Sequence, residues 1–245
     1  MPLTVQPQEY KIDGKTFDGA LIRDDAPGDE RKPKALPCVL IFHGWEGRSD
    51  GQVEFGERLA RLGYAAFACD LFGKGIRGDM AKDNSLLIAP FLEDRKMLRE
   101  RLLANVATVR KLPGVRPDRI AAIGFCFGGL CVLDLARAGS DVRAVVSFHG
   151  LFGPPQGLEK RPIQAKICAF HGWDDPMVPP AQVQALGAEL TAAGADWQLH
   201  AFGRTKHAFM VQDANRPEAG IQYDERAAQR AWKGAALFLE EALAG

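Results

Sequence analysis

The feature of this chain that most constrains its fold is the regular alternation of short apolar runs with longer segments of helical periodicity. We expect strands over residues 35–42, 64–69, 119–125, 142–148, 165–170 and 197–202, and helices over residues 53–62, 91–112, 128–138, 181–193 and 225–243. Strands that are separated by helices pair in parallel and carry helices on their faces. The alternation therefore predicts an α/β fold with a mainly parallel central sheet and helices on both faces.

The N-terminal part reads differently, because two alternating segments, residues 9–12 and 16–22, flank Asp13-Gly14. Asp-Gly between such segments is a hairpin signal, so we expect an antiparallel hairpin at the edge of the sheet. The polar stretch 24–34 is expected to form a loop. We find no repeat and no linker, and a length of 245 residues suits one α/β domain, so we expect a single domain over residues 1–245.

Composition and charge exclude several classes of function. Lys+Arg and Asp+Glu both number 31, so the chain has no net field to attract nucleic acid or an anionic membrane. No apolar stretch is long enough to span a bilayer, and the N-terminus lacks the pattern of a signal peptide. The five cysteines include no CxxC pair. We therefore expect a cytoplasmic protein with reduced cysteines and no nucleic-acid or membrane partner.

The strongest chemical signal is Gly124-Phe125-Cys126-Phe127-Gly128, between a predicted strand and a predicted helix. This is the G-x-S-x-G nucleophile elbow with cysteine in place of serine. Small residues two before and two after the nucleophile prevent collisions across the tight turn, and the positive end of the following helix favours a thiolate. The alternative is a packed cysteine between two phenylalanines, but the strand–turn–helix context favours a catalytic Cys126.

A cysteine nucleophile needs a base, and four histidines follow it in the chain. His149 and His171 lie at strand ends, and His200 lies within a predicted strand. Only His207 comes after both a candidate acid loop and the last strand, which is the chain order of this arrangement. We therefore predict His207 as the base, the alternative being a surface histidine.

The acid is expected in the loop 171–179, where Asp174 and Asp175 compete. Asp175 precedes a proline that stiffens the turn, so we predict Asp175 as the acid and Asp174 as a turn or helix-cap residue. Together the three groups would form a thioester acyl-enzyme by attack of the thiolate on a carbonyl. We expect the backbone N–H groups of Phe127 and Trp45 to hold the oxyanion.

From about Leu36 to the C-terminus the chain resembles the dienelactone hydrolase family. The resemblance rests on the ordered motifs FHGWEG, GYAAFACDLFGKG, IGFCFGG, HGWDDPMVP and KHAF. It implies an α/β-hydrolase fold with little or no lid, and a triad of Cys126, Asp175 and His207.

Two departures from the family pattern bear on the substrate. Founding members carry a glutamate near the cysteine where this chain has Gly44, and the nearest acid here is Glu46. An arginine that clamps a substrate carboxylate is replaced by the uncharged stretch around Met210. We therefore expect a neutral ester or lactone rather than an anionic one, in a pocket edged by Trp45, Phe127, Trp173 and Phe209. Glu46 either reaches this site from a different backbone position and helps to bind the substrate, or faces solvent.

The prediction is thus a carboxylic-ester or lactone hydrolase for a small-molecule substrate, monomeric or weakly homodimeric. No second histidine or carboxylate stands at metal-ligand spacing from His43, so we expect no metal and no cofactor. Two alternatives stay open. The same site could act on other electrophiles, such as a thioester, an activated peptide or a phosphotriester, or the fold could serve a non-catalytic binding protein.

Overall fold

The predicted N-terminal hairpin is present in the computed structural model, which describes residues 3–24, 35–79 and 82–244. Strands β1 (Thr4–Ile12) and β2 (Lys15–Arg23) pair antiparallel along their whole length. The two turn residues, Asp13 and Gly14, have φ angles of 48° and 76°, as a two-residue hairpin turn requires. The predicted loop 24–34 lies outside the described residues, apart from its first position.

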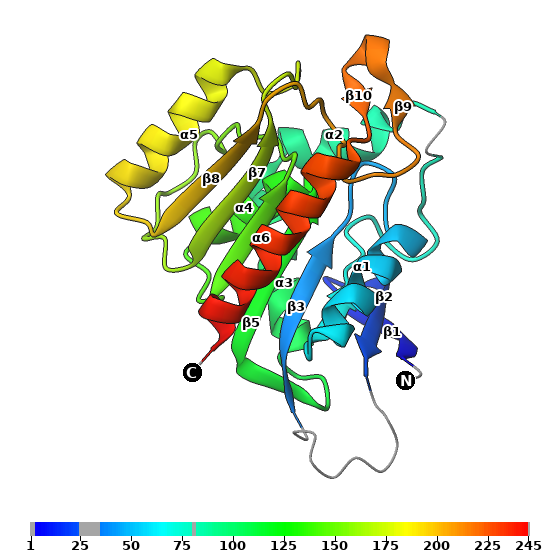
Figure 1. The fold of residues 1–245 in the computed structure, drawn as a ribbon. Coiled ribbons are helices and arrows are strands. Elements are labelled where there is room, and N and C mark those ends of the chain that lie inside the picture. The colour runs from blue at the N-terminus through cyan, green and yellow to red at the C-terminus, as the bar shows by residue number, and fades with distance from the viewer. Residues whose placement is uncertain (1–2, 25–34, 80–81, 245) are drawn as a thin grey trace. The chain divides into compact units, whose positions relative to one another are not determined.

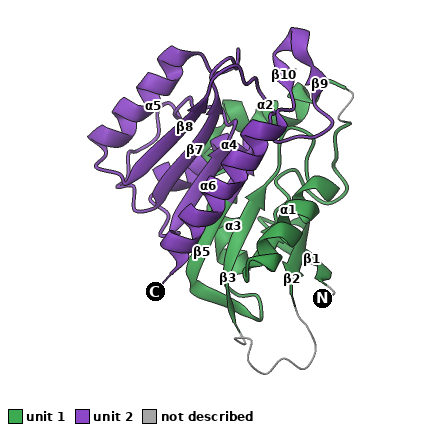
Figure 2. Ribbon diagram, viewed as in Figure 1, with its two compact units in different colours: residues 1–122 green, residues 123–245 purple. Residues whose placement is uncertain are grey.

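The chain divides into two units, residues 1–122 and 123–245, which Figure 2 colours separately. The prediction of one domain over residues 1–245 stays a prediction. After the hairpin, the first unit contains β3 (Leu36–Phe42), α1 (Asp50–Arg61), β4 (Ala65–Ala68), α2 (Ser85–Glu93) and α3 (Arg95–Val109). Strand β5 (Val115–Phe125) begins in the first unit and ends in the second (Figure 2), and Figure 1 labels this strand.

Within the first unit the strand order is β1-β2-β4-β3, with the hairpin outermost, as predicted. Strands β3 and β4 pair in parallel and are buried at nearly every position, which is typical of strands covered on both faces. Helix α1 packs on β2, β3 and β4, and α3 packs on β1. Gly56 lets α1 approach closely, since a Cβ there would lie 2.8 Å from Ile22 Cδ1.

The single helix predicted over residues 91–112 is wrong, because α2 and α3 are separate helices that meet at Asp94. The Asp94 side chain accepts a hydrogen bond of 2.8 Å from the Met97 N–H and so caps α3. Pro90 lies within α2 and cannot donate a backbone hydrogen bond. Apolar periodicity continues across the break, and for that reason it did not reveal the boundary.

The second unit is built on the parallel strands β6, β7 and β8, in that order. Its elements are α4 (Phe127–Arg137), β6 (Ala144–Phe148), β7 (Lys166–Gly172), α5 (Pro180–Ala192), β8 (Trp197–Phe202), β9 (Asn215–Arg216), the 3-10 helix η1 (Pro217–Ala219), β10 (Ile221–Gln222) and α6 (Glu225–Leu243). Helix α4 packs on β6, and α6 packs on β6 and β7. The short pair β9–β10 was not predicted, since two residues carry no periodicity.

The register of the second unit brings the ends of its strands together. Phe148 of β6 is paired with Phe170 of β7, so the histidines that follow, His149 and His171, leave neighbouring strands at the same edge. The backbone N–H of His149 donates to the Phe170 carbonyl at 2.8 Å.

Among the residues that the structure describes, no helix is long and apolar enough to cross a bilayer.

Candidate active site

Cys126 occupies a strained backbone position between the end of β5 and the start of α4. Its φ and ψ angles are 54° and −115°, a conformation that residues other than glycine rarely adopt. A Cβ at Gly124 would lie 2.0 Å from the carbonyl oxygen of Gly128, so only glycine fits at Gly124. The turn therefore has the geometry that the sequence predicts for a nucleophile elbow.

The surroundings of Cys126 differ from those of the other cysteines. Four are buried, and Cys126 alone is partly exposed. Its backbone N–H donates to the Phe148 carbonyl at 3.1 Å, and its carbonyl accepts from Leu130 N–H at 3.2 Å, at the start of α4. The N-terminus of that helix carries a partial positive charge, which favours a thiolate on the sulfur.

His207 lies beyond β8, on a loop whose backbone is held by β10 and the glycine before it. Its N–H donates to the Gly220 carbonyl at 2.9 Å, and its carbonyl accepts from Gln222 N–H at 3.0 Å. Its ring Nδ1 lies 2.7 Å from Asp175 Oδ2. That hydrogen bond places the Nδ1 proton toward the carboxylate and leaves Nε2 as the atom that can exchange a proton with a nucleophile.

Asp175 follows β7 and is buried, and both of its carboxylate oxygens accept hydrogen bonds. Oδ2 bonds with His207, and Oδ1 accepts from the Met177 N–H at 2.8 Å. Gly172 lets the two loops meet, since a Cβ there would lie 2.5 Å from the Thr205 carbonyl oxygen. The acid and the imidazole are thus held together by the backbone as well as by their own bond.

The electrostatics of His207 favour its protonated form. Burial lowers the pKa of His207. The charges of Cys126 and Asp175 and the hydrogen bonds to them outweigh burial and raise the pKa to about 10. Nε2 is buried and makes no hydrogen bond of good geometry with the described residues. Cys126 is the group that most raises the pKa of His207, ahead of Asp175.

The competing residues lie in other surroundings. Asp174 is exposed, and its backbone N–H donates to the Thr205 carbonyl. His200 is exposed as well, stacks on Phe170 and contacts Gln198. His149 and His171 are buried, and neither ring nitrogen of either residue has a hydrogen-bond partner among the described residues.

Of the predicted oxyanion and substrate residues, three belong to the second unit. Phe127 is the first residue of α4, and its side chain is buried. Trp173, in the loop between β7 and Asp175, is 43% exposed. Phe209 is fully buried and packs edge-on against His149 and Phe202, so it supports the rings beside the base. A direct contact of any of them with a substrate stays a prediction.

Trp45 and Glu46 belong to the loop after β3, in the first unit, and their predicted place in the site stays a prediction. The Glu46 carboxylate folds back over Gly44, since a Cβ at Gly44 would lie 2.5 Å from Glu46 Oε2. Glu46 Oε1 accepts a hydrogen bond of 3.2 Å from Gln52. Burial raises the pKa of Glu46. This carboxyl thus fills the space that a side chain at position 44 would occupy.

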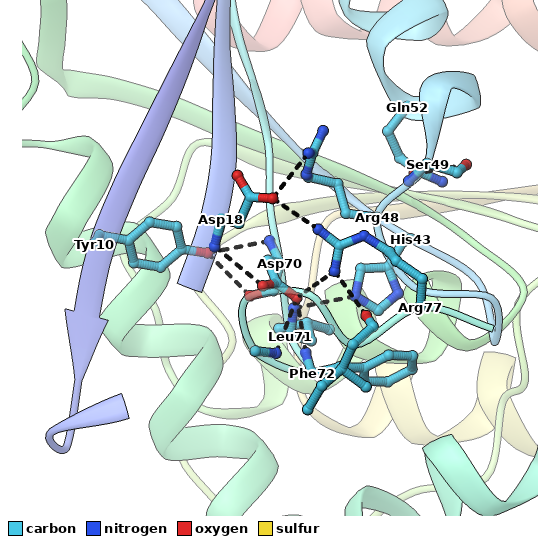
Figure 3. A network of polar contacts seen from close by, with 12 residues as sticks. Tyr10, Asp18, His43, Arg48, Ser49, Gln52, Asp70, Leu71, Phe72 and Arg77 are labelled. Carbon is cyan, nitrogen blue, oxygen red and sulfur yellow. Dashed lines mark hydrogen bonds and ion pairs between the residues drawn. The ribbon is translucent and has the colours of Figure 1, made fainter. Parts of the chain in front are cut away.

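A second polar cluster of the first unit, centred on Asp70 after β4, was not predicted (Figure 3). The buried Asp70 carboxylate accepts from the backbone N–H groups of Asp18, Phe72 and Gly73. His43 accepts from Leu71 N–H at 3.1 Å through Nε2, while its Nδ1 lies 2.7 Å from the Gly44 carbonyl. Burial lowers the pKa of His43 to about 4. No group of three metal-ligating side chains occurs in the part of the chain that the structure describes.

The chain matches one family model and is similar to several individual proteins. The model of the dienelactone hydrolase family matches residues 27–243. The solved structure of the dienelactone hydrolase-like promiscuous phosphotriesterase P91 from metagenomic libraries is 32% identical, with a TM-score of 0.90 over 98% of both chains. A probable 2-oxo-3-(5-oxofuran-2-ylidene)propanoate lactonase of Bradyrhizobium sp. is 27% identical over 222 residues, 86% of each chain. Protein K02A2.1 of Caenorhabditis elegans is 36% identical over 150 residues, 60% of this chain and 95% of that protein.

Proposed function

The chain belongs to the dienelactone hydrolase family, and from that premise we propose that it cleaves neutral carboxylic esters or lactones through Cys126, His207 and Asp175. The α/β-hydrolase fold expected from the sequence is confirmed, as is a hydrolase that acts on lactone or ester bonds. The observation that carries the mechanism is the 2.7 Å bond between His207 Nδ1 and Asp175 Oδ2 beside a strained cysteine at a helix N-terminus.

In the first half-reaction the Cys126 thiolate attacks the carbonyl carbon of the ester, and the carbonyl oxygen becomes an oxyanion. The backbone N–H of Phe127, at the first position of α4, is the donor that we assign to that oxyanion. The carbon–oxygen bond to the leaving group then breaks, and His207 gives its Nε2 proton to the departing alkoxide. The product is a thioester on Cys126 and a neutral His207.

In the second half-reaction His207 Nε2 removes a proton from a water molecule, which attacks the thioester carbon. The carbon–sulfur bond breaks, the acid product leaves, and the thiolate and imidazolium are regenerated. Asp175 stays ionised throughout and keeps the Nδ1 proton of His207 in place. The balance needs only the substrate and water, so the proposal requires no cofactor.

A neutral substrate is favoured by the residues that follow the base. Ala208, Phe209 and Met210 are buried and uncharged. The neighbouring Lys206 is directed to the Pro217 carbonyl, to which its Nζ donates at 2.8 Å. Trp173 offers exposed aromatic surface beside the acid loop, so we propose that it contacts an aryl or acyl group of the substrate.

The mechanism is tested by Cys126→Ala, which we expect to lower turnover of a chromogenic aryl ester by at least ~10³-fold. Cys131→Ala, five residues along α4 at a buried site, is the matched control and should keep most of the activity. Turnover by Cys126→Ala at the wild-type rate would refute a cysteine nucleophile.

A second candidate reaction is phosphotriester hydrolysis, favoured by the 32% identity to a promiscuous phosphotriesterase. The same thiolate would attack phosphorus and release an aryl alcohol, leaving a phosphorylated sulfur for water to hydrolyse. Comparing kcat/KM for an aryl ester and for an aryl phosphotriester distinguishes the two substrates.

The rates at which iodoacetamide alkylates the cysteines between pH 5 and 9 distinguish an enzyme from a non-catalytic binding protein. One fast-reacting cysteine supports catalysis, whereas five slow ones support the binding function. We further propose that the protein is cytoplasmic and is a monomer or a weak homodimer. Sedimentation velocity would measure the oligomeric state.

A further inference from the structure

His149 has no part in the mechanism above, yet it packs on the base and follows a residue that is hydrogen-bonded to the nucleophile's backbone. It follows β6 directly, and the residue before it, Phe148, accepts the Cys126 N–H at 3.1 Å. Its ring centroid is 5.1 Å from that of His207, with an edge-to-face angle of 70°. The end of β6 thus contacts the ring of His207 and the backbone of Cys126.

The surroundings of the His149 ring are aromatic. Phe209 lies edge-on at 5.3 Å, and Phe125, the residue before the nucleophile, lies at 6.1 Å. Neither ring nitrogen of His149 has a hydrogen-bond partner among the described residues. What this ring offers to His207 is therefore its packing surface rather than a hydrogen bond.

Two features of His149 are unfavourable for folding. Its backbone has a φ of 36°, in the left-handed region that residues with a side chain avoid. Its side chain is fully buried, and neither ring nitrogen has a hydrogen-bond partner among the described residues. Strained and unsatisfied groups of this kind concentrate at functional sites.

The surroundings of His149 favour its neutral form. Burial lowers its pKa well below the ordinary value, and the charge of His207 and then that of His171 lower it further. The titratable groups that surround the pair are Cys126 on the elbow and His171 and Asp175 at and after the end of β7. A neutral ring can pack against a protonated His207 without repelling it.

We infer that His149 is a positioning residue that holds the His207 ring in the orientation that delivers Nε2 to Cys126. This inference rests on the proposed function, because orientation of the base has meaning only where the base acts. By contacting His207 through its ring and Cys126 through the preceding carbonyl, the end of β6 fixes the distance between base and nucleophile.

The test compares two variants at one position. His149→Asn removes the ring but tolerates a positive φ, whereas His149→Phe keeps a ring and removes only the nitrogens. We expect His149→Asn to lower kcat for an aryl ester by about 10- to 100-fold with KM nearly unchanged, since misplacement of a catalytic group costs this much. His149→Phe should recover most of the loss.

The second readout is the rate of Cys126 alkylation by iodoacetamide as a function of pH, which needs no ester turnover. We expect His149→Asn to move its midpoint to higher pH, because a misoriented imidazolium stabilises the thiolate less. His200→Phe, at an exposed histidine that stacks on Phe170, is the control and should leave both measurements unchanged. Phe209→Leu, which loosens the wall behind His149, should shift both in the same direction by less.

The inference is overturned if His149→Asn keeps the wild-type kcat and alkylation midpoint, or changes only the melting temperature. It is also overturned if His149→Phe is as defective as His149→Asn while equally folded. Failure of the proposed function would show differently, as full turnover by Cys126→Ala.

Discussion

The two units each contain a buried polar cluster, and the clusters differ in how completely their groups are paired. In the first unit, the Asp70 carboxylate accepts three backbone N–H groups, and the Tyr10 hydroxyl donates to the Asp70 carbonyl at 2.9 Å. In the second unit, His149 and His171 are as deeply buried, but none of their four ring nitrogens has a partner among the described residues.

This difference separates a structural cluster from a functional one. Buried polar groups are nearly always hydrogen-bonded because an unsatisfied one costs about 1–3 kcal/mol. The Asp70 cluster follows that rule and joins the loop after β4 to the hairpin β1–β2 through Asp18. The ring nitrogens of His149 and His171 have no such protein partners among the described residues, and these rings lie near a strained Cys126 and a His207 whose pKa is raised to about 10.

The largest expected effect tests the functional cluster. Asp175→Asn should lower kcat for an aryl ester by about 10³-fold, because an amide no longer holds the Nδ1 proton of His207 in place. Asp174→Asn, at the exposed neighbour, is the matched control and should leave kcat within about 2-fold. Equal losses in the two variants would show that the loop, not the carboxylate at position 175, matters.

The next effect tests the structural cluster. Asp70→Asn should lower the free energy of unfolding by about 2–4 kcal/mol, because one amide oxygen cannot replace two carboxylate oxygens that accept three N–H groups. Urea unfolding measures the loss. The pH dependence of Cys126 alkylation should stay that of the wild type, and a shifted profile would contradict a purely structural role.

The smallest effect concerns pH and His43. Because its folded pKa of about 4 lies below the unfolded value near 6.5, the unfolded state binds more protons between these values. His43 then stabilises the fold above about pH 6.5 and loses up to about 3 kcal/mol of that contribution as the pH falls toward 4. Urea unfolding at pH 7 and at pH 4.5 should show a weaker dependence in His43→Gln. An unchanged dependence would assign the acid sensitivity to other groups.

His207 affects the pH dependence of the free energy of unfolding in the opposite direction. Its folded pKa of about 10 lies above the unfolded value, so its stabilising contribution is complete below about pH 6.5 and is lost as the pH rises toward 10. The two histidines thus act on opposite sides of neutral pH. His149 and His171, whose pKa values are also lowered by burial, add acid sensitivity in the second unit.

Much of the fold could be predicted because its signals are local. Strand β8 and helix α6 have the predicted bounds, Trp197–Phe202 and Glu225–Leu243, and the Asp-Gly turn identified the hairpin. The break between α2 and α3 at Asp94 was not predicted. The cap that creates it depends on one side chain and leaves the apolar periodicity intact. The roles of His207 and Asp175 could also be predicted, from the order of the groups along the chain and from the proline that follows the acid.

The residues that surround the site could not be predicted from local signals of this kind. His149 and His171 were weighed only as rival bases, although both follow predicted strands with the same His-Gly ending, a signal that places them at one sheet edge. That they surround His207 depends on the pairing of β6 with β7 and on the loop beyond β8.

The sequence by itself determined the elbow, the order of strands and helices, and the identity of the three candidate catalytic groups. The elbow and the helices and strands depend on neighbours within a few residues, whose sterics and periodicity act along the chain, and the acid and the base depend also on their order after the nucleophile. Only the tertiary structure decided that Asp175 is buried and Asp174 exposed, that the Glu46 carboxyl covers Gly44, and that His149 packs on His207. Burial, raised or lowered pKa values and ring contacts arise between residues far apart in the chain, and strand register brings these residues together.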